Sequence, residues 1–472
     1  MLILRDTFTK RHISSIRGCY IEYKPDGVGR RTGAMASPSI IIVGAGLAGL
    51  AAARILQRRG GVVAVFEARE RIGGRVWTRR DGFGDMHGEA GGELIDADQN
   101  EIRNLARELG LSEHRILRSG FAHYRLGQNG RRRMRSARSG WQATARAIAP
   151  LVRAYKINEQ EWDGPIAQTI AARSVDDWLN ETKATSEVRA TAMTMRNFFL
   201  ADPDDLSLLV YADQFATGGN PAGNTLYRLQ GGNDRLPERM ARALRSPVRL
   251  RHVVRRIAQT KMGVRVTVEN DRRRSELSAT CALVTAPAPL AAEIEFVPDL
   301  PEAQRDAFAR LKYGPATKTL LQFDHTSWRR PGKPRACATD LEVGAVWDAS
   351  ENERGRKGML AVLAGGGASV STRSLLKAGG ATDLVARLRF FGIGRARLVA
   401  FHSVSWEDDP WARGAYAVFG RSFAPSARRL LKMPSGRIFF AGEHTSVKWQ
   451  GYMNGAIASG LRAAEEISAL FL

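Results

Sequence analysis

The sequence predicts an α/β fold organised around a buried parallel sheet, and the segment 40–67 carries the observations that predict it. The four β-branched residues at 40–43 are typical of a strand that is covered on both faces. A helix is expected over Leu47–Arg58, and a second apolar run at 62–66 follows it. Strand, helix and strand in this order form a βαβ unit, which requires a parallel sheet.

The turn after the first strand reads G-x-G-x-x-G, with Gly44, Gly46 and Gly49 at the conserved spacing of a dinucleotide site. Gly44 allows the tight turn, Gly46 lets the backbone approach a pyrophosphate, and Gly49 lets the helix lie close to the sheet. The helix N-terminus directs free N–H groups at that phosphate. Glu67 ends the second strand, where an acid would accept from a ribose hydroxyl. A Rossmann-type site is therefore favoured over a glycine-rich turn of an unrelated domain.

Length and composition indicate a globular protein of two or three domains. The chain has 472 residues, of which 44% are hydrophobic and 8% aromatic. No apolar stretch is long enough to span a bilayer. Cys19, Cys281 and Cys337 lie far apart and form no metal or redox spacing, so we expect reduced thiols, a cytoplasmic location and no bound metal.

The formal net charge is +23, which is compatible with a nucleic-acid or membrane-surface partner. The densest basic runs, 131–135 and 272–274, lie in polar, turn-like sequence. Because the excess is mostly arginine spread along the whole chain, solvated basic faces are favoured over a nucleic-acid site.

Residues 1–37 contain basic residues but no apolar periodicity and no apolar core of a secretory signal. We expect a disordered extension, or an upstream start codon with Met35 as the true first residue.

Further glycines and periodic segments follow the first unit. The pair at 73–74, flanked by arginines, suits contacts to a pyrophosphate, and a second pair stands at 91–92. The next segments are expected to be a helix around 102–109, a strand at 121–126, and a largely helical insertion over 115–218 with helices at 141–155, 175–180 and 188–199.

The second half of the chain alternates strands and helices. The expected elements are a helix from 235 to 244, strands at 263–268 and 282–287, a helix at 302–311, a strand at 317–323, a helix around 382–391, a strand at 437–441, and a closing helix opened by 449–456.

Taken together, these motifs resemble the flavin-containing amine oxidase family, including the monoamine oxidases. The resemblance extends from Ser39 to Leu472, and the matching blocks are 43–50, 66–78, 88–95, 229–236, 440–446 and 449–456. It implies a Rossmann-type FAD-binding domain built from 38–98, 226–290 and 413–472, and an α+β substrate-binding domain built from 99–225 and 291–412.

The resemblance also implies the cofactor contacts. Glu67 would hold the adenosine ribose, Val254 the adenine through backbone groups, and Met453 would bring a backbone N–H to the pyrimidine end of the flavin. A helix N-terminus at that edge stabilises the reduced ring. The residues implied along the pyrophosphate and ribityl chain are Arg69, Arg75 and Glu443, and the further glycines of the cofactor site are Gly74, Gly91, Gly92 and Gly442.

Three residues are implied to act on the substrate side. Lys318 matches the lysine that holds a water near flavin N5, the alternative being a strand lysine that reaches solvent. Tyr416 and Tyr452 match two aromatic residues that flank the substrate amine, the alternative being two core tyrosines. Trp406 is expected to pack nearby in a structural role. Ala415 stands where the mitochondrial relatives carry the cysteine that bonds the flavin, so we expect non-covalent FAD and, since no anchoring tail follows the closing helix, no membrane anchor.

The expected reaction is transfer of a hydride from the carbon α to an uncharged amine to flavin N5, followed by hydrolysis of the imine to an aldehyde and reoxidation by dioxygen to hydrogen peroxide. The enzyme class is an oxidoreductase acting on CH–NH2 or CH–NH donors. A monoamine is ranked first. A polyamine comes second, because Glu93 and Asp96 could attract distal ammonium groups, and an amino acid third, because 93–96 lacks an arginine for its carboxylate.

Other classes stay open. A desaturase of the same fold, an interaction protein and a demethylase-like enzyme acting at nucleic acid are the alternatives, and a homodimer is allowed although the sequence does not give the oligomeric state.

Overall fold

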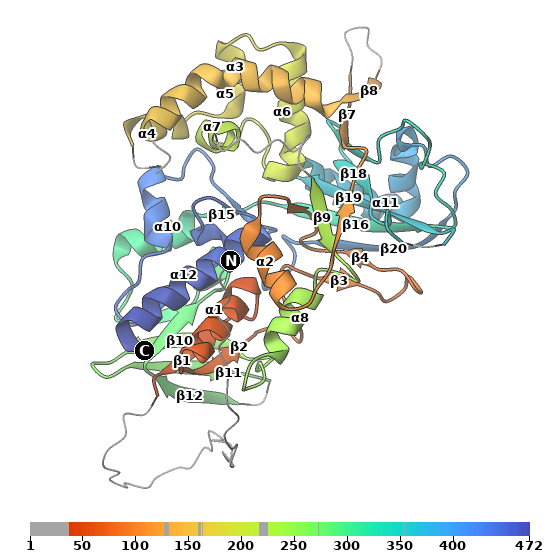
Figure 1. Ribbon diagram of the computed structural model, residues 1–472. Coiled ribbons are helices and arrows are strands. Elements are labelled where there is room, and N and C mark those ends of the chain that lie inside the picture. The colour runs from red at the N-terminus through yellow and green to blue at the C-terminus, as the bar shows by residue number, and fades with distance from the viewer. Residues whose placement is uncertain are drawn as a thin grey trace, which may run out of the picture. The chain divides into compact units, whose positions relative to one another are not determined.

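The computed structural model contains a parallel sheet of four strands in the order β2-β1-β13-β22, called the central sheet because it joins segments from both ends of the chain. The structure describes residues 37–126, 132–158, 162, 164–216, 225–271, 273–353 and 355–472. The predicted extension 1–37 therefore lies outside the described residues except for its last one, as do Met35, Cys19, Arg131 and Arg272. Figure 1 shows the sheet with α1 and α12 lying side by side against it.

The central sheet joins segments from both ends of the chain. Its strands are β1 (Ser39–Val43), β2 (Val62–Phe66), β13 (Cys281–Val284) and β22 (Ile438–Phe440). Ile40 and Ile42 pack with the helices α1 (Leu47–Arg58) and α12 (Met453–Phe471), whereas Ile41 and Val43 pack with a second sheet. Burial on both faces explains why the strand is apolar throughout and not alternating.

The second sheet has the order β12-β11-β10-β14. Its strands are β10 (Val253–Gln259), β11 (Val264–Glu269), β12 (Arg274–Ala279) and β14 (Glu295–Val297). Beside it, the short helices α9 (Ala288–Ala291) and α10 (Glu302–Arg310) follow in the chain. The predicted alternation over 263–268 is confirmed, since alternate residues of β11 are buried.

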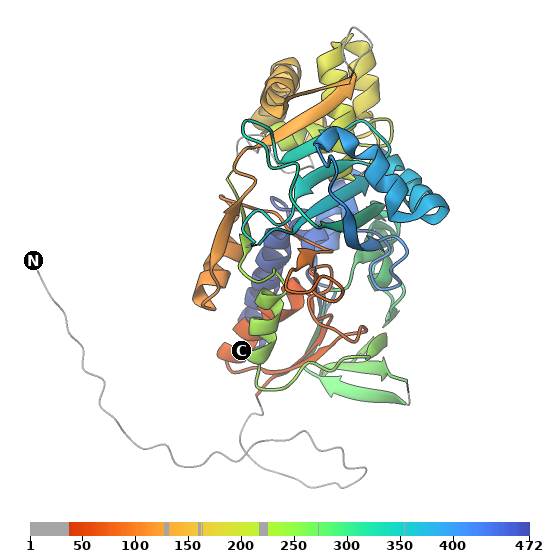
Figure 2. The ribbon, with the colours of Figure 1, turned by 90° about the vertical axis from the view of Figure 1, so that its right-hand side faces the viewer.

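A mixed sheet of seven strands, in the order β20-β16-β19-β18-β17-β7-β8, carries the middle of the chain. Its strands are β7 (Phe121–Leu126), β8 (Arg132–Ser136), β16 (Ala316–Phe323), β17 (Ala336–Thr339), β18 (Ala345–Asp348), β19 (Gly358–Gly365) and β20 (Leu398–Ser405). Figure 2 shows α11 (Gly367–Arg387) against this sheet, and the helices of the insertion at its other end.

The predicted helical insertion is confirmed. It comprises α3 (Ala137–Asn158), α4 (Pro165–Ala171), α5 (Val175–Glu181), α6 (Ser186–Phe199) and α7 (Leu208–Ala216). Ser174 begins α5 with a reciprocal capping box, in which its hydroxyl accepts from the backbone N–H of Asp177 and the Asp177 carboxylate accepts from the backbone N–H of Ser174. The helices α6 and α3 pack on the seven-stranded sheet.

The remaining elements are short. They are β3 (Thr78–Arg79), β4 (Gly88–Glu89), β5 (Ile95–Asp96), α2 (Asn100–Glu108), β6 (Glu113–Ile116), β9 (Leu226–Leu229), α8 (Arg235–Arg242), β15 (Lys312–Tyr313), the 3-10 turns η1 (Arg389–Phe391), η2 (Pro425–Leu431) and η3 (Glu443–Thr445), and β21 (Ala417–Val418).

Several sequence predictions were wrong in detail. Residues 132–135 of the basic run lie in the edge strand β8 and not in a turn. Long charged side chains suit such an edge because they discourage pairing with another chain. The helix expected around 382–391 begins at Gly367 and contains a break at Gly380, whose φ is 68°. The closing helix begins at Met453, because residues 449–452 form a turn before it.

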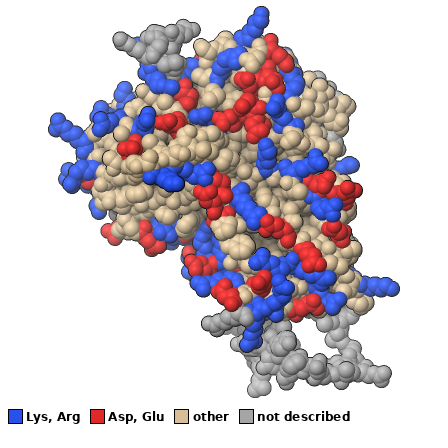
Figure 3. Space-filling view, turned by 180° about the vertical axis from the view of Figure 1, so that it is seen from behind, with Lys and Arg blue, Asp and Glu red and all other residues tan. Residues whose placement is uncertain are grey.

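The described residues from Ser37 to Leu472 belong to one compact unit. The three predicted cofactor-domain segments each supply at least one strand of the central sheet, but the domain boundaries stay a prediction. On the face shown in Figure 3, Lys and Arg side chains are interspersed with Asp and Glu side chains. Such mixing of charges is typical of a solvated surface. That the chain has no nucleic-acid site stays a prediction.

Candidate functional site

A cavity of about 540 Å³ runs from the glycine turn after β1 to the helices of the insertion. Fifteen of the sixteen predicted site residues line it: Gly44, Gly46, Glu67, Arg69, Gly74, Arg75, Gly91, Gly92, Val254, Lys318, Tyr416, Gly442, Glu443, Tyr452 and Met453. Gly49 lies outside the cavity, within α1.

The three glycines of the first turn have separate structural reasons. Gly44 has a φ of 104°, a backbone angle that residues other than glycine rarely adopt. A Cβ on Gly49 would lie 2.1 Å from the carbonyl oxygen of Gly44, so only glycine lets α1 pack this closely. A Cβ on Gly46 would meet no atom within 4 Å, because the backbone there faces the open cavity. These are the features that a pyrophosphate-binding turn requires.

Glu67 is held at the cavity wall by two backbone N–H groups. Its Oε2 accepts from the N–H of Ala45 at 2.8 Å, and its Oε1 accepts from the N–H of Arg69 at 2.9 Å. The carboxylate therefore connects the glycine turn to the turn after β2. Val254 lines the same cavity from β10, and its contact to an adenine stays a prediction.

Arg75 and Glu443 form an ion pair in the middle of the cavity wall. Arg75 Nη1 donates to Glu443 Oε1 at 2.8 Å and to the carbonyl oxygen of Ala415 at 2.9 Å. Glu443 Oε2 accepts from the N–H of Gly451 at 2.9 Å. Burial alone would raise the pKa of Glu443, but Arg75, His444 and the N–H of Gly451 together outweigh burial and hold this pKa below its ordinary value. Arg69 is paired separately, with Asp409 at 2.7 Å.

The N-terminus of α12 lies at the cavity next to this ion pair. Tyr452 is the N-cap residue, its side chain makes no capping hydrogen bond, and Met453 begins the helix. The first N–H groups of α12 are therefore available to a ligand. A helix N-terminus also carries a partial positive charge, which suits a flavin edge that becomes anionic on reduction.

Tyr416 and Tyr452 both line the cavity, from segments on either side of Glu443. Tyr416 Oη donates to the carbonyl oxygen of Phe198 at 2.5 Å, and a Cβ on Gly451 would lie 3.1 Å from the Tyr416 ring. The Tyr452 ring meets that of Trp449 edge-on at 5.6 Å. Burial raises the pKa of Tyr416, and Tyr452 raises it further, so the two rings are electrostatic neighbours. Tyr452 itself is 37% exposed at the cavity.

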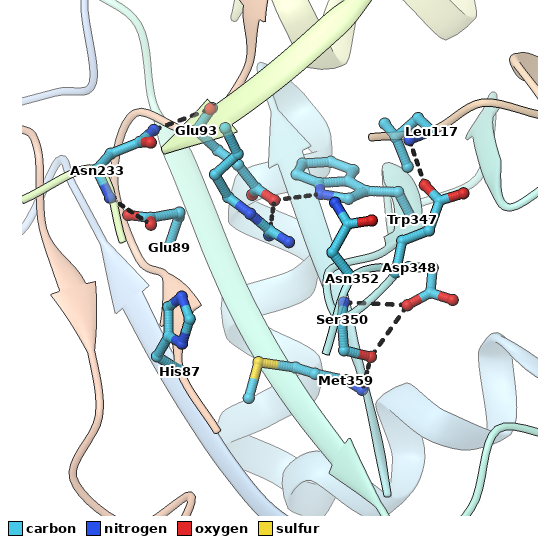
Figure 4. Close-up of polar contacts among 12 residues, drawn as sticks. His87, Glu89, Glu93, Leu117, Asn233, Trp347, Asp348, Ser350, Asn352 and Met359 are labelled. Atoms are coloured by element: carbon cyan, nitrogen blue, oxygen red, sulfur yellow. Dashed lines mark hydrogen bonds and ion pairs between the residues drawn. The ribbon is translucent and has the colours of Figure 1, made fainter. Parts of the chain in front are cut away.

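Lys318 does not reach solvent, so the alternative prediction of a strand lysine that extends into solvent was wrong. Its ammonium donates to Glu93 Oε2 at 2.7 Å and to the carbonyl oxygen of Gly91 at 2.9 Å. Glu93 Oε1 accepts in addition from Arg228 and from Trp347 Nε1, each at 3.0 Å (Figure 4). Because cations already hold the Glu93 carboxylate, it is a poor site for a polyamine's ammonium group.

The comparisons with known proteins agree with this geometry. The model of the flavin containing amine oxidoreductase family matches residues 47–468. The chain belongs to this family. A putative flavin-containing monoamine oxidase of Mycobacterium tuberculosis is 30% identical over 93% of this chain and 100% of its own length. Amine oxidase A of Bos taurus is 24% identical over 91% of this chain and 84% of its own.

Solved structures give the same fold. Cyclohexylamine oxidase from Brevibacterium oxydans is 25% identical and superposes with a TM-score of 0.82, over 92% of this chain and 99% of that chain. A putrescine oxidase bound to putrescine is 24% identical with a TM-score of 0.80, at the same coverage, and this likeness shows the fold alone. The predicted family and fold class are confirmed, and the family implies a flavin cofactor.

The cavity of this amine oxidoreductase fits such a cofactor. The open backbone at Gly46 and the uncapped N-termini of α1 and α12 face one continuous space, which has donors for a pyrophosphate at one end and for a ring edge at the other. Among the residues that the structure describes, no helix is both long and apolar enough to cross a membrane.

Sequence reasoning missed the far half of the cavity. It is lined by Trp141 from α3, Met195, Phe198 and Phe199 from α6, Val210 and Asp213 from α7, Trp162 and Arg428. Tyr155 Oη donates to Asp213 at 2.8 Å, and the Arg428 guanidinium lies 3.8 Å from the centre of the Trp162 ring. The only signal in the sequence was the aromatic content of the insertion, since these residues stand in no motif.

Trp406 was expected to pack near the site, and it does. Its indole Nε1 donates to the carbonyl oxygen of Ala90 at 3.1 Å, and the side chain is buried at the cavity wall. This bond ties the second glycine pair to the segment before Tyr416, which is consistent with a structural role.

Proposed function

We propose that this chain is an FAD-dependent amine oxidase that acts on primary or secondary monoamines. The observation that carries the proposal is that Tyr416 and Tyr452 line the same cavity as the glycine turn and the N-terminus of α12. Two aromatic rings beside one another accept an amine through their faces and restrict its approach. Bound FAD would supply the hydride acceptor, and dioxygen would reoxidise it with release of hydrogen peroxide.

The residues of the chain have distinct parts in this reaction. Glu67, Arg75 and the amides of α12 would hold the cofactor, in the order ribose, pyrophosphate–ribityl chain and flavin edge. Tyr416 and Tyr452 would orient the amine, and the mainly apolar walls of the cavity beyond them would favour its neutral form over the ammonium. A neutral amine has the lone pair that assists loss of hydride from the adjacent carbon. The resulting imine leaves and hydrolyses to an aldehyde.

The cofactor is proposed to be non-covalent. Ala415 offers a methyl group where a covalent link would need a thiol, and its carbonyl oxygen accepts from Arg75. The two described cysteines, Cys281 and Cys337, are buried in strands β13 and β17 and do not line the cavity.

A monoamine is favoured by the walls of the cavity. Beyond the tyrosines they are formed mainly by aromatic and aliphatic side chains of α3, α6 and α7, and Glu93 is held by Lys318 and Arg228. The chain's likeness to a cyclohexylamine oxidase agrees with an apolar amine. None of the described arginines of the insertion lines the cavity, and Arg428, which does line its far half, donates to the carbonyl oxygens of Ser446 and Val447. Both observations count against an amino acid.

A diamine or polyamine is the second candidate. Asp96 and Asp98 line the cavity and are close enough to raise the pKa of Tyr452, so a second ammonium group would find acidic side chains there. Gln99 donates to Asp96 Oδ2 at 3.0 Å, which partly occupies that carboxylate.

The test is a peroxide-coupled screen of the purified yellow protein with cyclohexylamine, aryl-alkyl monoamines, putrescine, spermidine and amino acids. We expect peroxide with apolar monoamines, at a rate that rises with pH through the ionisation of the substrate amine. A Tyr416→Leu, Tyr452→Leu double variant that keeps its flavin serves as the control and should lose most activity. A chain that stays colourless with added FAD, or that reduces its flavin only with amino acids or with substrates that carry no amine, contradicts the proposal.

A further inference from the structure

Three charged side chains meet in the interior beside the cavity. Lys318 comes from β16, Arg228 from β9, and Glu93 from the segment after β4; their side chains are 5%, 7% and 2% exposed. Glu93 lies between the two cations, 2.7 Å from Lys318 Nζ and 3.0 Å from Arg228 Nη1. Trp347 Nε1 donates to the same carboxylate, as Figure 4 shows. The cluster is therefore buried and held together by its own hydrogen bonds.

The cluster is also held rigidly. Lys318 stands in the middle of β16, where every residue is buried, and pairs with Leu363 of β19 and Val404 of β20. Its ammonium has a second acceptor in the carbonyl oxygen of Gly91, and it lies 5.2 Å from the centre of the Trp347 ring. These contacts come from different strands and loops, so the ammonium cannot move without breaking several of them.

These three side chains carry an excess of one positive charge, because two cations face one carboxylate. Glu89 interacts with Glu93 and Arg228, and because burial raises its pKa to about 7, it is mostly protonated at pH 6, where the variants are to be compared. Glu93, Lys318 and Trp347 line the cavity, whereas Arg228 stands behind them. Burial alone would raise the pKa of Glu93, but Lys318 and Arg228 outweigh it and hold this pKa below its ordinary value. Glu93 is thus a carboxylate at neutral pH and has no proton to give.

We propose that Glu93 is a positioning residue that fixes the Lys318 ammonium against Gly91 and sets the net charge beside the flavin, and through it the reduction potential of the bound cofactor. This inference rests on the proposed function, since it needs a flavin in the cavity. A positive charge in a dry environment favours the reduced flavin, which carries more negative charge than the oxidised one. Glu93 limits that effect by cancelling one of the two cations.

The test is the reduction potential of the flavin in Glu93→Gln, measured at pH 6 by equilibration with redox dyes. Glutamine keeps the shape of the side chain and leaves the cluster with two positive charges. We expect the potential to become more positive, so that the ratio of reduced to oxidised flavin at a fixed dye ratio rises about tenfold or more. Lys318→Met should shift the potential in the negative direction, and the double variant, whose charge equals that of the original chain, should return towards the starting value.

Asp348→Asn is the matched control. Asp348 is also a buried carboxylate that accepts from an indole N–H, that of Trp328 at 3.1 Å, and from an arginine, Arg329. It stands next to Trp347 in β18 but does not line the cavity. Its loss should lower the thermal stability as the Glu93 change does, without moving the potential.

The outcomes separate the two proposals. An original chain that takes up no flavin overturns the proposed function, before any variant is made, and this inference with it. A flavin-bound Glu93→Gln protein with an unchanged potential, or an equal shift in Asp348→Asn, overturns the inference alone. Should Glu93→Gln not fold, the double variant decides, because its potential must lie above that of Lys318→Met.

Discussion

The hydroxyl of Tyr416 donates a hydrogen bond of 2.5 Å to the carbonyl oxygen of Phe198. Tyr416 precedes β21, close to the ion pair of Arg75 and Glu443, whereas Phe198 stands in the last turn of α6 in the helical insertion. The bond therefore fixes one of the two rings proposed to flank the amine to the part of the chain that forms the far wall of the cavity.

Replacing Tyr416 by Phe should remove this bond and keep the ring. Because one neutral hydrogen bond contributes about 1 kcal/mol, we expect kcat/KM for a monoamine to fall about fivefold, mostly through KM. The flavin absorbance spectrum should stay unchanged. Tyr124→Phe is the control, since that ring stacks on Phe390 at 4.1 Å outside the cavity. An equal loss in both variants would contradict a role for the Tyr416 bond.

The second and third glycines of the turn separate binding from folding. Gly49→Ala should lower the melting temperature markedly, because its Cβ would lie 2.1 Å from the carbonyl oxygen of Gly44. Gly46→Ala has open space and an extended φ of −76°, so it should fold normally and weaken FAD binding about tenfold. Thermal melts of the apoprotein and flavin titration measure the two effects. Equal FAD affinity of Gly46→Ala and the original chain would count against a pyrophosphate at this turn.

Replacing Arg75 by Gln should leave Glu443, which is 5% exposed, without its cation. Removing one partner of such a pair costs about 3 kcal/mol, and we expect the free energy of unfolding to fall by that amount. Arg242→Gln is the control, because its pair with Glu238 lies on the surface, and its effect should stay within about 0.5 kcal/mol. Urea unfolding curves of both variants provide the comparison.

Glu89 should make the stability depend on pH. Its side chain is fully buried, and burial raises its pKa to about 7. The pKa of this carboxyl group in the unfolded chain is about 4.5. Between pH 4.5 and pH 7, the folded chain therefore keeps a proton that the unfolded chain loses. Its contribution to stability is therefore complete at low pH and is lost as the pH rises to 7, by about 3 kcal/mol in total. Glu89→Gln should lack this slope in urea unfolding measured from pH 4.5 to 8, and parallel curves would contradict the raised pKa.

Acid precipitation should leave the yellow colour in the supernatant, because Ala415 cannot form a covalent bond to the flavin. Absorbance of the pellet and the supernatant measures this. Colour that stays with the pellet would show a covalent link through another residue.

The sequence predicted the parts of the site that obey short-range rules. The glycine turn, the strand that ends in Glu67 and the helix from Leu47 to Arg58 follow from local spacing, and the resemblance located the residues of the last segment. The link between Lys318 and Glu93 could not be predicted, since the two residues are 225 positions apart and only the folded sheet brings them together. In the same way, the residues of α6 and α7 at the far wall stand in no motif. The first half of α11 was missed because Gly379 and Gly380 interrupt its pattern.

The central sheet joins β1 to β13 and β22, and α12 packs on α1. On the ribosome, where the chain emerges N-terminus first, the first βαβ unit must wait for residues 438–471 before its sheet and its covering helix are complete. A nascent chain of this protein thus exposes the apolar side of α1 through almost the whole of translation. Holdase chaperones would be expected to bind the chain at this apolar side. A frameshift shortly before Met453 should consequently yield a degraded polypeptide and not an oxidase of reduced activity.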